Sequence, residues 1–411
     1  MSMITKYVEN RNFNTTLINF IFQCKSKKEE IMAHTILCKL MSYTNGLYKE
    51  EDEFAKQKLL NYVMNFNVMS QSINDVYFVN FSLLIPSKEV VSDFNIKDAI
   101  KFVLDSIYIP NIENGKYNER LFEREKRLYA EGLLNGYKNV NFIAEKNMLD
   151  LLDSEGLFNK LKYRDVDNIS ELENADIVDY YNNYIKDYIP RIFINGYVDK
   201  EHVENILSDY FKNKKLKKQK LITKYNSFYN NNELIDVSED SNFYQSIVYM
   251  IYGVKDYKEE DFYKLYLINL LLSSSSSDLL LYNLRKKNNL VYASGSSVLL
   301  KNGLLLVKAI TSKNNIKLSK MVIENVINSL KNIDDYKENI ANIIYRLNLN
   351  LEREKDDFYV STGNIINKYY KSDLSSEEEF DIISNIERDE LLDVINRIEI
   401  KCIYTLEGNR E

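Results

Sequence analysis

The chain has 411 residues, of which 45% are hydrophobic and 28% charged, and its formal net charge is −7. That length suffices for two or three domains with sizeable cores, and the composition is typical of an ordinary globular protein. A net negative charge argues against broad nucleic-acid affinity, so we expect no nucleic-acid partner.

The cysteines and the apolar stretches indicate the compartment. Residues 1–11 are charged and have no apolar core, so a signal peptide is not expected. The most apolar stretch, residues 265–284, is interrupted by five serines and Asp278 and falls short of a membrane span. No pair of cysteines has the spacing of a metal clip or a redox motif; the three are Cys24, Cys38 and Cys402. We therefore expect free thiols in a cytoplasmic protein, with no membrane partner.

Strands and helices alternate in the first half. Residues 14–24 are rich in β-branched and aromatic side chains and predict a strand, and residues 76–85 predict a second that ends at Pro86. A short third strand is expected over residues 191–195. Apolar spacing and capping residues predict helices over 29–41, 51–63, 96–107, 119–134, 140–152, from the capping box at 170–173 to about 188, and 199–211.

A lysine-rich segment follows the first half. Six of the nine residues from Lys212 to Lys220 are lysines, and a polar stretch continues to Asp240. Like charges repel one another and keep such a run solvated, which favours a linker over residues 212–240. A patch for an anionic partner is the alternative interpretation.

The second half repeats this plan. A strand is expected over residues 243–252, and Lys301-Asn302-Gly303 predicts a hairpin turn between strands 290–299 and 304–311. A last strand, 398–406, ends before Gly408 as strand 191–195 ends before Gly196. Helices are expected over 259–272, 279–287, 318–330, 336–353 and 358–371. Corresponding segments are offset by about 210–230 residues, which indicates two homologous α/β domains, 1–211 and 241–411.

Several motifs resemble those of the insulinase/pitrilysin family of peptidases. Residues 273–294 are similar to that family's serine-rich turn, its "LRE" helix end and its "GLAYS" strand. Residues 122–126 (FEREK), 188–199 (YIPRIFINGYVD) and 400–408 (IKCIYTLEG) resemble further family segments, the last in its non-zinc members. The resemblance spans nearly the whole chain. It implies an α+β fold of two homologous domains, each a mixed, mostly antiparallel sheet covered by helices on one face, enclosing a chamber.

The resemblance also implies where a zinc site would stand. Active members carry H-x-x-E-H, in which two histidines hold Zn²⁺ and the glutamate is the general base. Aligned with that motif, His34 is kept, Leu37 replaces the base and Cys38 replaces the second histidine. Gly132 falls where a downstream helix should supply the third ligand, and Glu131 is one position away. A His34/Cys38 pair could hold a metal geometrically, but it lacks a base and a third ligand, so no cofactor is expected in this chain.

Arg285 and Tyr292 are separated by the family's spacing for its second-half pair. In relatives this pair holds the carbonyl oxygen of the scissile peptide bond. A guanidinium and a phenol are both donors that can stabilise developing negative charge on that oxygen. An exposed helix-end arginine and an ordinary strand tyrosine are the structural alternative.

These observations predict a catalytically inactive subunit of a heterodimeric zinc peptidase. Its partner would be a homologous subunit that bears the zinc, and its substrate a peptide, for example a modified-peptide precursor or leader. A non-proteolytic scaffold or peptide-binding protein of the same fold is the second hypothesis. An autonomous metalloenzyme with a divergent site is the third.

Overall fold

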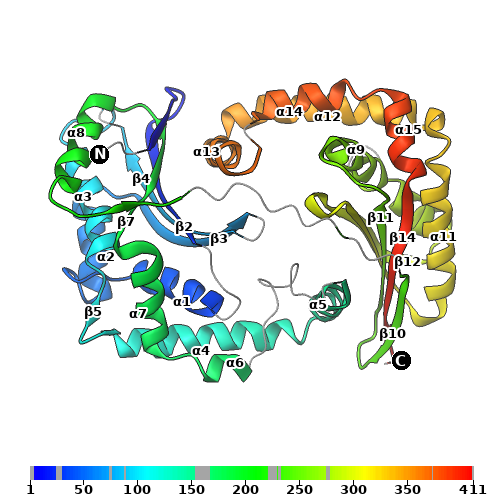
Figure 1. Cartoon of the computed structure of the whole chain (residues 1–411), viewed down its shortest axis with the longest axis horizontal. Helices are drawn as coiled ribbons and strands as arrows, with labels where there is room; N and C mark the ends of the chain where they lie inside the picture. The colour runs from blue at the N-terminus through cyan, green and yellow to red at the C-terminus, as the bar shows by residue number, and fades with distance from the viewer. Residues whose placement is uncertain are drawn as a thin grey trace. The chain divides into compact units, whose positions relative to one another are not determined.

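The computed structural model describes residues 4–24, 30–73, 76–87, 89–152, 167–220, 229, 233–274, 278–372 and 374–409. The chain forms two compact units (Figure 1). Unit 1 comprises Met1–Asn135, Tyr163–Thr223 and Glu354–Asp373, and unit 2 comprises Gly136–Lys162, Lys224–Arg353 and Leu374–Glu411. Each unit therefore takes segments from both halves of the sequence.

Unit 1 contains a five-stranded sheet in the order β1-β8-β2-β4-β3. β1 runs parallel to β8, and the other neighbouring strands are antiparallel. The strands are β1 (Thr5–Glu9), β2 (Thr15–Cys24), β3 (Asn65–Ile73), β4 (Val76–Pro86) and β8 (Arg191–Gly196), with two short pairs, β5 (Ile112–Glu113) with β6 (Lys116–Tyr117) and β7 (Tyr188–Ile189) with β9 (Lys217–Lys218).

Helices pack on the apolar side chains of this sheet. Phe54 of α2, Phe66 of β3 and Phe102 of α3 form one aromatic cluster, with ring centroids 5.0–5.9 Å apart, and all three are buried. The helices of unit 1 are α1 (Ile31–Met41), α2 (Glu51–Leu60), α3 (Ile96–Tyr108), α4 (Glu119–Gly136), α6 (Asp167–Ser170), α7 (Asn174–Tyr181), α8 (Lys200–Phe211) and α13 (Phe358–Asn367), with the π-helices η2 (Asn182–Lys186) and η8 (Lys368–Ser372).

Unit 2 repeats the sheet with the same connectivity. Its strand order is β10-β14-β11-β13-β12, and again only the outermost pair, β10 with β14, is parallel. The strands are β10 (Ile235–Ser241), β11 (Ser246–Val254), β12 (Val291–Leu299), β13 (Leu304–Thr311) and β14 (Ile398–Gly408). The predicted fold class, two homologous units with mostly antiparallel sheets covered by helices, is confirmed.

The core of unit 2 lies between β11 and its helices. Val248 and Met250 of β11 pack with Leu265 and Ile268 of α9 and Ile323 of α11, all fully enclosed. The helices are α5 (Val140–Leu152), α9 (Phe262–Leu272), α10 (Leu279–Leu281), α11 (Ile316–Ser329), α12 (Lys337–Asp356), α14 (Ser376–Ser384) and α15 (Arg388–Asn396), the π-helix η4 (Tyr282–Lys287), and the 3₁₀ turns η3 (Glu259–Asp261), η5 (Leu300–Asn302), η6 (Lys313–Asn315) and η7 (Ile333–Tyr336). None of the helices described here combines the length and apolar character that crossing a bilayer requires.

Several elements differ from the sequence prediction. The edge strands β1, β3 and β10 and the helices α14 and α15 were not predicted. The segment interpreted as linker contains β9 and β10, while its residues 221–228 and 230–232 lie outside the described part. The helix predicted to reach Val63 ends at Leu60, because Tyr62 turns to φ 54° and the amide of Val63 bonds back to the carbonyl of Lys58. This is a Schellman-type end with a tyrosine where glycine is usual.

Candidate functional site

The helix aligned with the zinc motif is α1, and its motif positions are buried. His34 and Leu37 have no exposed surface, and Cys38 has 1%. The hydroxyl of Tyr180, in α7, lies 2.7 Å from Nδ1 of His34. The rings of Tyr77 and Tyr180 meet the imidazole edge-on, with centroids 5.4 and 5.3 Å away. His34 is therefore a packed core residue whose Nδ1 is held by a phenol.

The thiols near His34 are poor metal ligands. Burial raises the pKa of Cys38 well above its usual range. Burial also raises the pKa of Cys24 to about 12, although hydrogen bonds from Tyr180 and the backbone of Val79 lower it in part. The ligand form of cysteine is the thiolate, which such burial opposes.

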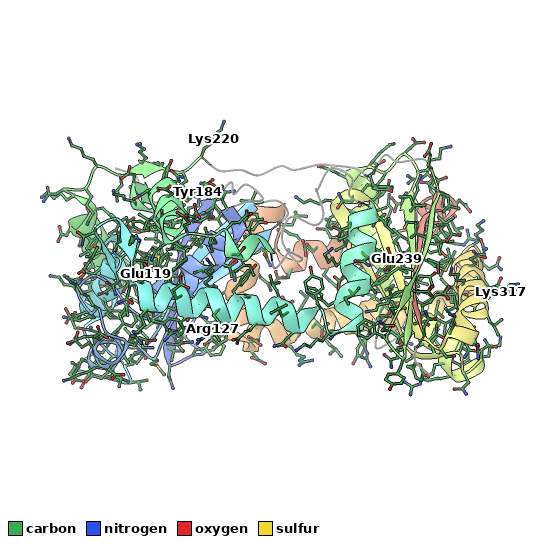
Figure 2. All side chains as sticks on the ribbon, turned by 90° about the horizontal axis from the view of Figure 1, so that it is seen from below. Glu119, Arg127, Tyr184, Lys220, Glu239 and Lys317 are labelled. Carbon is green, nitrogen blue, oxygen red and sulfur yellow. The ribbon has the colours of Figure 1, made fainter. Side chains whose placement is uncertain are left out.

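Gly132 lies on α4, a long helix on which Glu119 and Arg127 are labelled in Figure 2. Within the described part of the chain, a Cβ added at this position would meet no atom within 4 Å. Its neighbour Glu131 is exposed, with Oε1 3.8 Å from the guanidinium of Arg127. Together with the buried apolar Leu37, these residues do not fit a catalytic zinc site, which needs three ligands and an open fourth position.

Arg285 lies in the π-helix η4, not in a regular α-helix as predicted. Its side chain is exposed. The chain continues from α10 into η4 after Asp278 caps α10, where the amide of Leu281 donates to Asp278 Oδ1 at 2.8 Å. π-Helical turns are rare and occur frequently at functional sites. Residues 275–277 of the predicted serine turn lie outside the described part.

Tyr292 lies at a β-bulge in β12. The pairing of β12 with β13 slips between Val291, opposite Thr311, and Ala293, opposite Ile310, so Tyr292 is the extra residue. Its side chain is 56% exposed. A bulge turns a side chain away from the regular alternation of the strand, and bulges are common beside active sites.

A buried pair of leucines connects these two irregular turns. The amide of Leu290 donates to the carbonyl of Leu284 at 2.8 Å, and both side chains are buried. The hydroxyl of Thr311 donates to the carbonyl of Leu290 at 2.6 Å. Arg285 directly follows the first leucine and Tyr292 follows the second by two positions. This frame of two leucines is buried, and the two hydrogen-bond donors beside it, Arg285 and Tyr292, are exposed.

The outer edge of β12 is a further feature of this surface. Among the described strands, β12 pairs only with β13. Its middle residues are small: Ala293, Ser294, Gly295, Ser296 and Ser297. Such an edge leaves backbone donors and acceptors available for an added strand. The motif spacing identified Arg285 and Tyr292 in the sequence. No sequence pattern predicted the π-helix or the β-bulge in which they lie.

Comparison with known proteins finds one family model that matches part of the chain. Residues 171–342 match a family model described as "Peptidase M16 inactive domain", a stretch that contains Arg285 and Tyr292 but not His34. No curated protein sequence matches the chain significantly.

Solved structures resemble the chain over its whole length. A conserved protein from Enterococcus faecalis V583 is 18% identical, with a TM-score of 0.87, and the match covers 99% of this chain and 96% of that one. A protease from Helicobacter pylori is 14% identical, with a TM-score of 0.73 and coverage of 98% and 96%. A peptidase M16 inactive domain from Pseudomonas fluorescens is 14% identical, with a TM-score of 0.63 and coverage of 99% and 95%.

Proposed function

We propose that this chain, which matches the peptidase M16 inactive-domain model over residues 171–342, is an insulinase-family homologue of the inactive type and the non-catalytic subunit of a heterodimeric zinc peptidase. In this proposal the chain holds no catalytic zinc, and a homologous partner with an intact H-x-x-E-H motif supplies it. The substrate is a peptide, for example a precursor or leader, and the setting is the cytoplasm.

The proposal rests on the contrast between the zinc-motif region and the region of Arg285 and Tyr292. The zinc-motif positions His34, Leu37 and Cys38 are enclosed in a core, where neither a metal-bound water nor a substrate has access. Arg285 and Tyr292 are exposed at two backbone irregularities joined by one buried frame. A subunit that has lost chemistry but retained substrate contacts would show this combination.

The proposed role of the pair is to hold the carbonyl of the scissile bond. A guanidinium and a phenol donate hydrogen bonds to an oxygen on which negative charge develops. The bond between Leu290 and Leu284 joins the backbone close to both residues, and in this proposal it limits the reorganisation needed when the substrate arrives. The small residues of β12 would let an extended peptide approach this strand edge and add to the sheet.

The decisive experiment is co-purification of the full chain with a homologue that carries H-x-x-E-H, followed by peptide cleavage assays. We expect cleavage by the complex, no cleavage by this chain alone, and loss of cleavage with a chelator. A partner variant in which the general-base glutamate becomes glutamine is the matched control and should assemble without cleaving. If the two chains assemble and the complex cleaves no peptide, the scaffold hypothesis replaces this one.

A further inference from the structure

A second candidate site lies in unit 2, between α9 and α12. The two helices leave a cavity of about 510 Å³, which is within the range of ligand pockets. Tyr266 and Leu270 line it from α9, and Ser274 lines it from the turn that follows. Of these residues, only Ser274 belongs to a motif identified in the sequence, the serine-rich turn.

The α12 wall of this cavity is cationic. Arg346, Asn350 and Arg353 all line it, and their spacing of four and then three residues places them on one helical face. Among the described residues that line the cavity, none is acidic. This is notable in a chain with a net charge of −7. Two guanidiniums and a carboxamide can all donate hydrogen bonds to one anionic group.

Most of the remaining lining is apolar. Leu270, Leu347 and Ile343 form part of it, and the exposed Leu349 and Tyr345 lie at α12 positions beside them. A simple inorganic anion would leave these side chains uncovered. The lining therefore favours a ligand that joins a carboxylate to an apolar side chain, as the acidic or C-terminal residue of a peptide does.

The phenol of Tyr266 adds a donor to this cavity. Burial, together with the nearby charge of Glu379, raises the pKa of Tyr266, so the hydroxyl keeps its proton. The carboxylate of Glu379 accepts a hydrogen bond from Tyr263 at 3.0 Å and is not among the lining residues.

We propose that the cavity between α9 and α12 is an anchor for a peptide carboxylate, with Arg353, Asn350 and Arg346 as its recognition groups. The turn after α9 connects the cavity to β12, since an added Cβ on Gly295 would lie 3.6 Å from Ser273 Oγ, and Ser274 lines the cavity. This inference deepens the proposed function, because it supplies a preference for acidic peptides at the unit that carries Arg285 and Tyr292.

The test measures peptide binding to the full-length chain alone by fluorescence anisotropy. The labelled probe is an octapeptide of alternating valine and threonine that ends in leucine and glutamate. Three further probes replace the glutamate by glutamine, amidate the C-terminus, or do both. We expect the doubly neutral peptide to bind roughly tenfold or more weakly than the acidic one, as loss of a charge-assisted hydrogen bond implies. The singly neutral probes show whether the side chain or the terminal carboxylate is recognised.

Two pairs of variants locate the site. Arg353→Ala and Asn350→Asp should each weaken the acidic peptide by roughly tenfold and leave the doubly neutral peptide unchanged. The matched controls, Arg127→Ala on α4 and Asn348→Asp on α12, make the same changes at exposed positions outside the cavity and should not alter binding. Circular dichroism checks that each variant is folded.

Equal binding of the acidic and doubly neutral peptides to the wild-type chain would overturn the proposal, as would unchanged binding by both cavity variants. These binding measurements need neither the partner subunit nor peptide cleavage. Their outcome is therefore independent of the test of the proposed function. A complex that does not cleave peptides would leave a carboxylate preference intact, and an active complex without that preference would refute only the anchor.

Discussion

The side-chain amide of Asn195, at the end of β8, donates hydrogen bonds at 2.9 Å to Ser361 Oγ and Thr362 Oγ1 in α13, more than 160 residues later. Asn195 is completely buried, so these bonds form without competition from water. They attach a helix from the second half of the sequence to the sheet of unit 1.

The reverse exchange occurs in unit 2, where α5 from the first half packs on β11 and β14. Asn147 of α5 donates to Glu239 Oε2 at 2.7 Å, and the hydroxyl of Tyr404 donates to the same oxygen at 2.6 Å; Glu239 is labelled in Figure 2. Each half of the sequence thus completes the unit built mainly by the other.

Replacing Asn195 by alanine should destabilise unit 1. The change removes a buried donor that serves two hydroxyl groups, for which a loss of about 1–3 kcal/mol is expected. Urea unfolding followed by circular dichroism measures the difference. Asn342→Ala, at an exposed position of α12, is the control and should change stability by less than about 0.5 kcal/mol. Equal stability of Asn195→Ala and wild type would show that these bonds do not hold α13 in place.

Separately expressed halves should not fold alone. A fragment of residues 1–211 lacks α13, and a fragment of residues 241–411 lacks α5, so each would expose the sheet surface that the missing helix covers. We expect broad, non-cooperative thermal unfolding for each fragment and cooperative unfolding after mixing, when the helices are exchanged. Size-exclusion chromatography should then show a complex of the two. Cooperative unfolding of either fragment alone would contradict this expectation.

The sequence was informative where structure is local or repeated. The strong strands β2, β4 and β11 and the hairpin of β12 and β13 follow from their residue patterns. The edge strands β3 and β10 were missed, because polar residues such as Asn65, Asn67 and Asp236 lower their β-propensity, and one face of β10 is only partly buried. The helix exchange depends on contacts between residues far apart in the chain, which periodicity does not report.

The same distinction applies to the candidate site. Arg285 and Tyr292 were identified by a local motif, whereas the π-helix and the bulge depend on how η4 packs against β12. The arginines of α12 were interpreted only as part of a helix. The cavity that they line lies between α9 and α12, a tertiary arrangement that no motif predicts.

Unit 2 should lose stability in acid through Asp261. Burial alone would raise the pKa of Asp261, but hydrogen bonds from Arg397, at 2.7 and 3.0 Å, and from the amide of Lys258 hold it below its usual value. A lowered folded-state pKa means that the contribution is present above the unfolded pKa of about 3.9 and is lost as the pH falls through the folded value.

Asp261→Asn should therefore cost about 1.5–3 kcal/mol near neutral pH and less at pH 3, as measured by urea unfolding across that range. Asp334→Asn breaks the exposed pair with Arg388 and is the matched control, for which little change is expected. A constant difference between Asp261→Asn and wild type from pH 7 to pH 3 would show that this carboxylate does not link folding to pH.

We expect a glutamate at the general-base position of the zinc motif to unfold unit 1 rather than to restore catalysis. Leu37→Glu introduces a carboxylate at a position with no exposed surface, at an expected cost of roughly 3–5 kcal/mol. Lys39→Glu, an exposed position on the same helix, is the control and should be tolerated. Thermal unfolding gives the comparison, and elemental analysis tests for zinc. A Leu37→Glu chain that is as stable as wild type would mean that α1 is less tightly packed than described.

Substituting Arg285 or Tyr292 should lower the kcat of the complex with the zinc-bearing partner. If both groups hold the scissile carbonyl, their contribution grows as negative charge develops on the oxygen. Arg285→Ala and Tyr292→Phe should then lower kcat by on the order of 100–1000-fold while peptide binding changes less. Arg285→Lys should recover only part of the loss, because an ammonium lacks the planar fork of a guanidinium.

The controls for this pair come from the same turn. Tyr282→Phe and Lys286→Ala change exposed residues of η4 that carry a phenol and a positively charged donor, and both should leave kcat unchanged. Size-exclusion chromatography must first show that every variant assembles with the partner. Leu284 and Leu290 are buried and untouched by these substitutions, so we expect the fold of the site to be preserved and the kinetics to report on the donors themselves. Wild-type turnover by both Arg285→Ala and Tyr292→Phe in an assembled complex would remove the pair from the mechanism and favour a scaffold role.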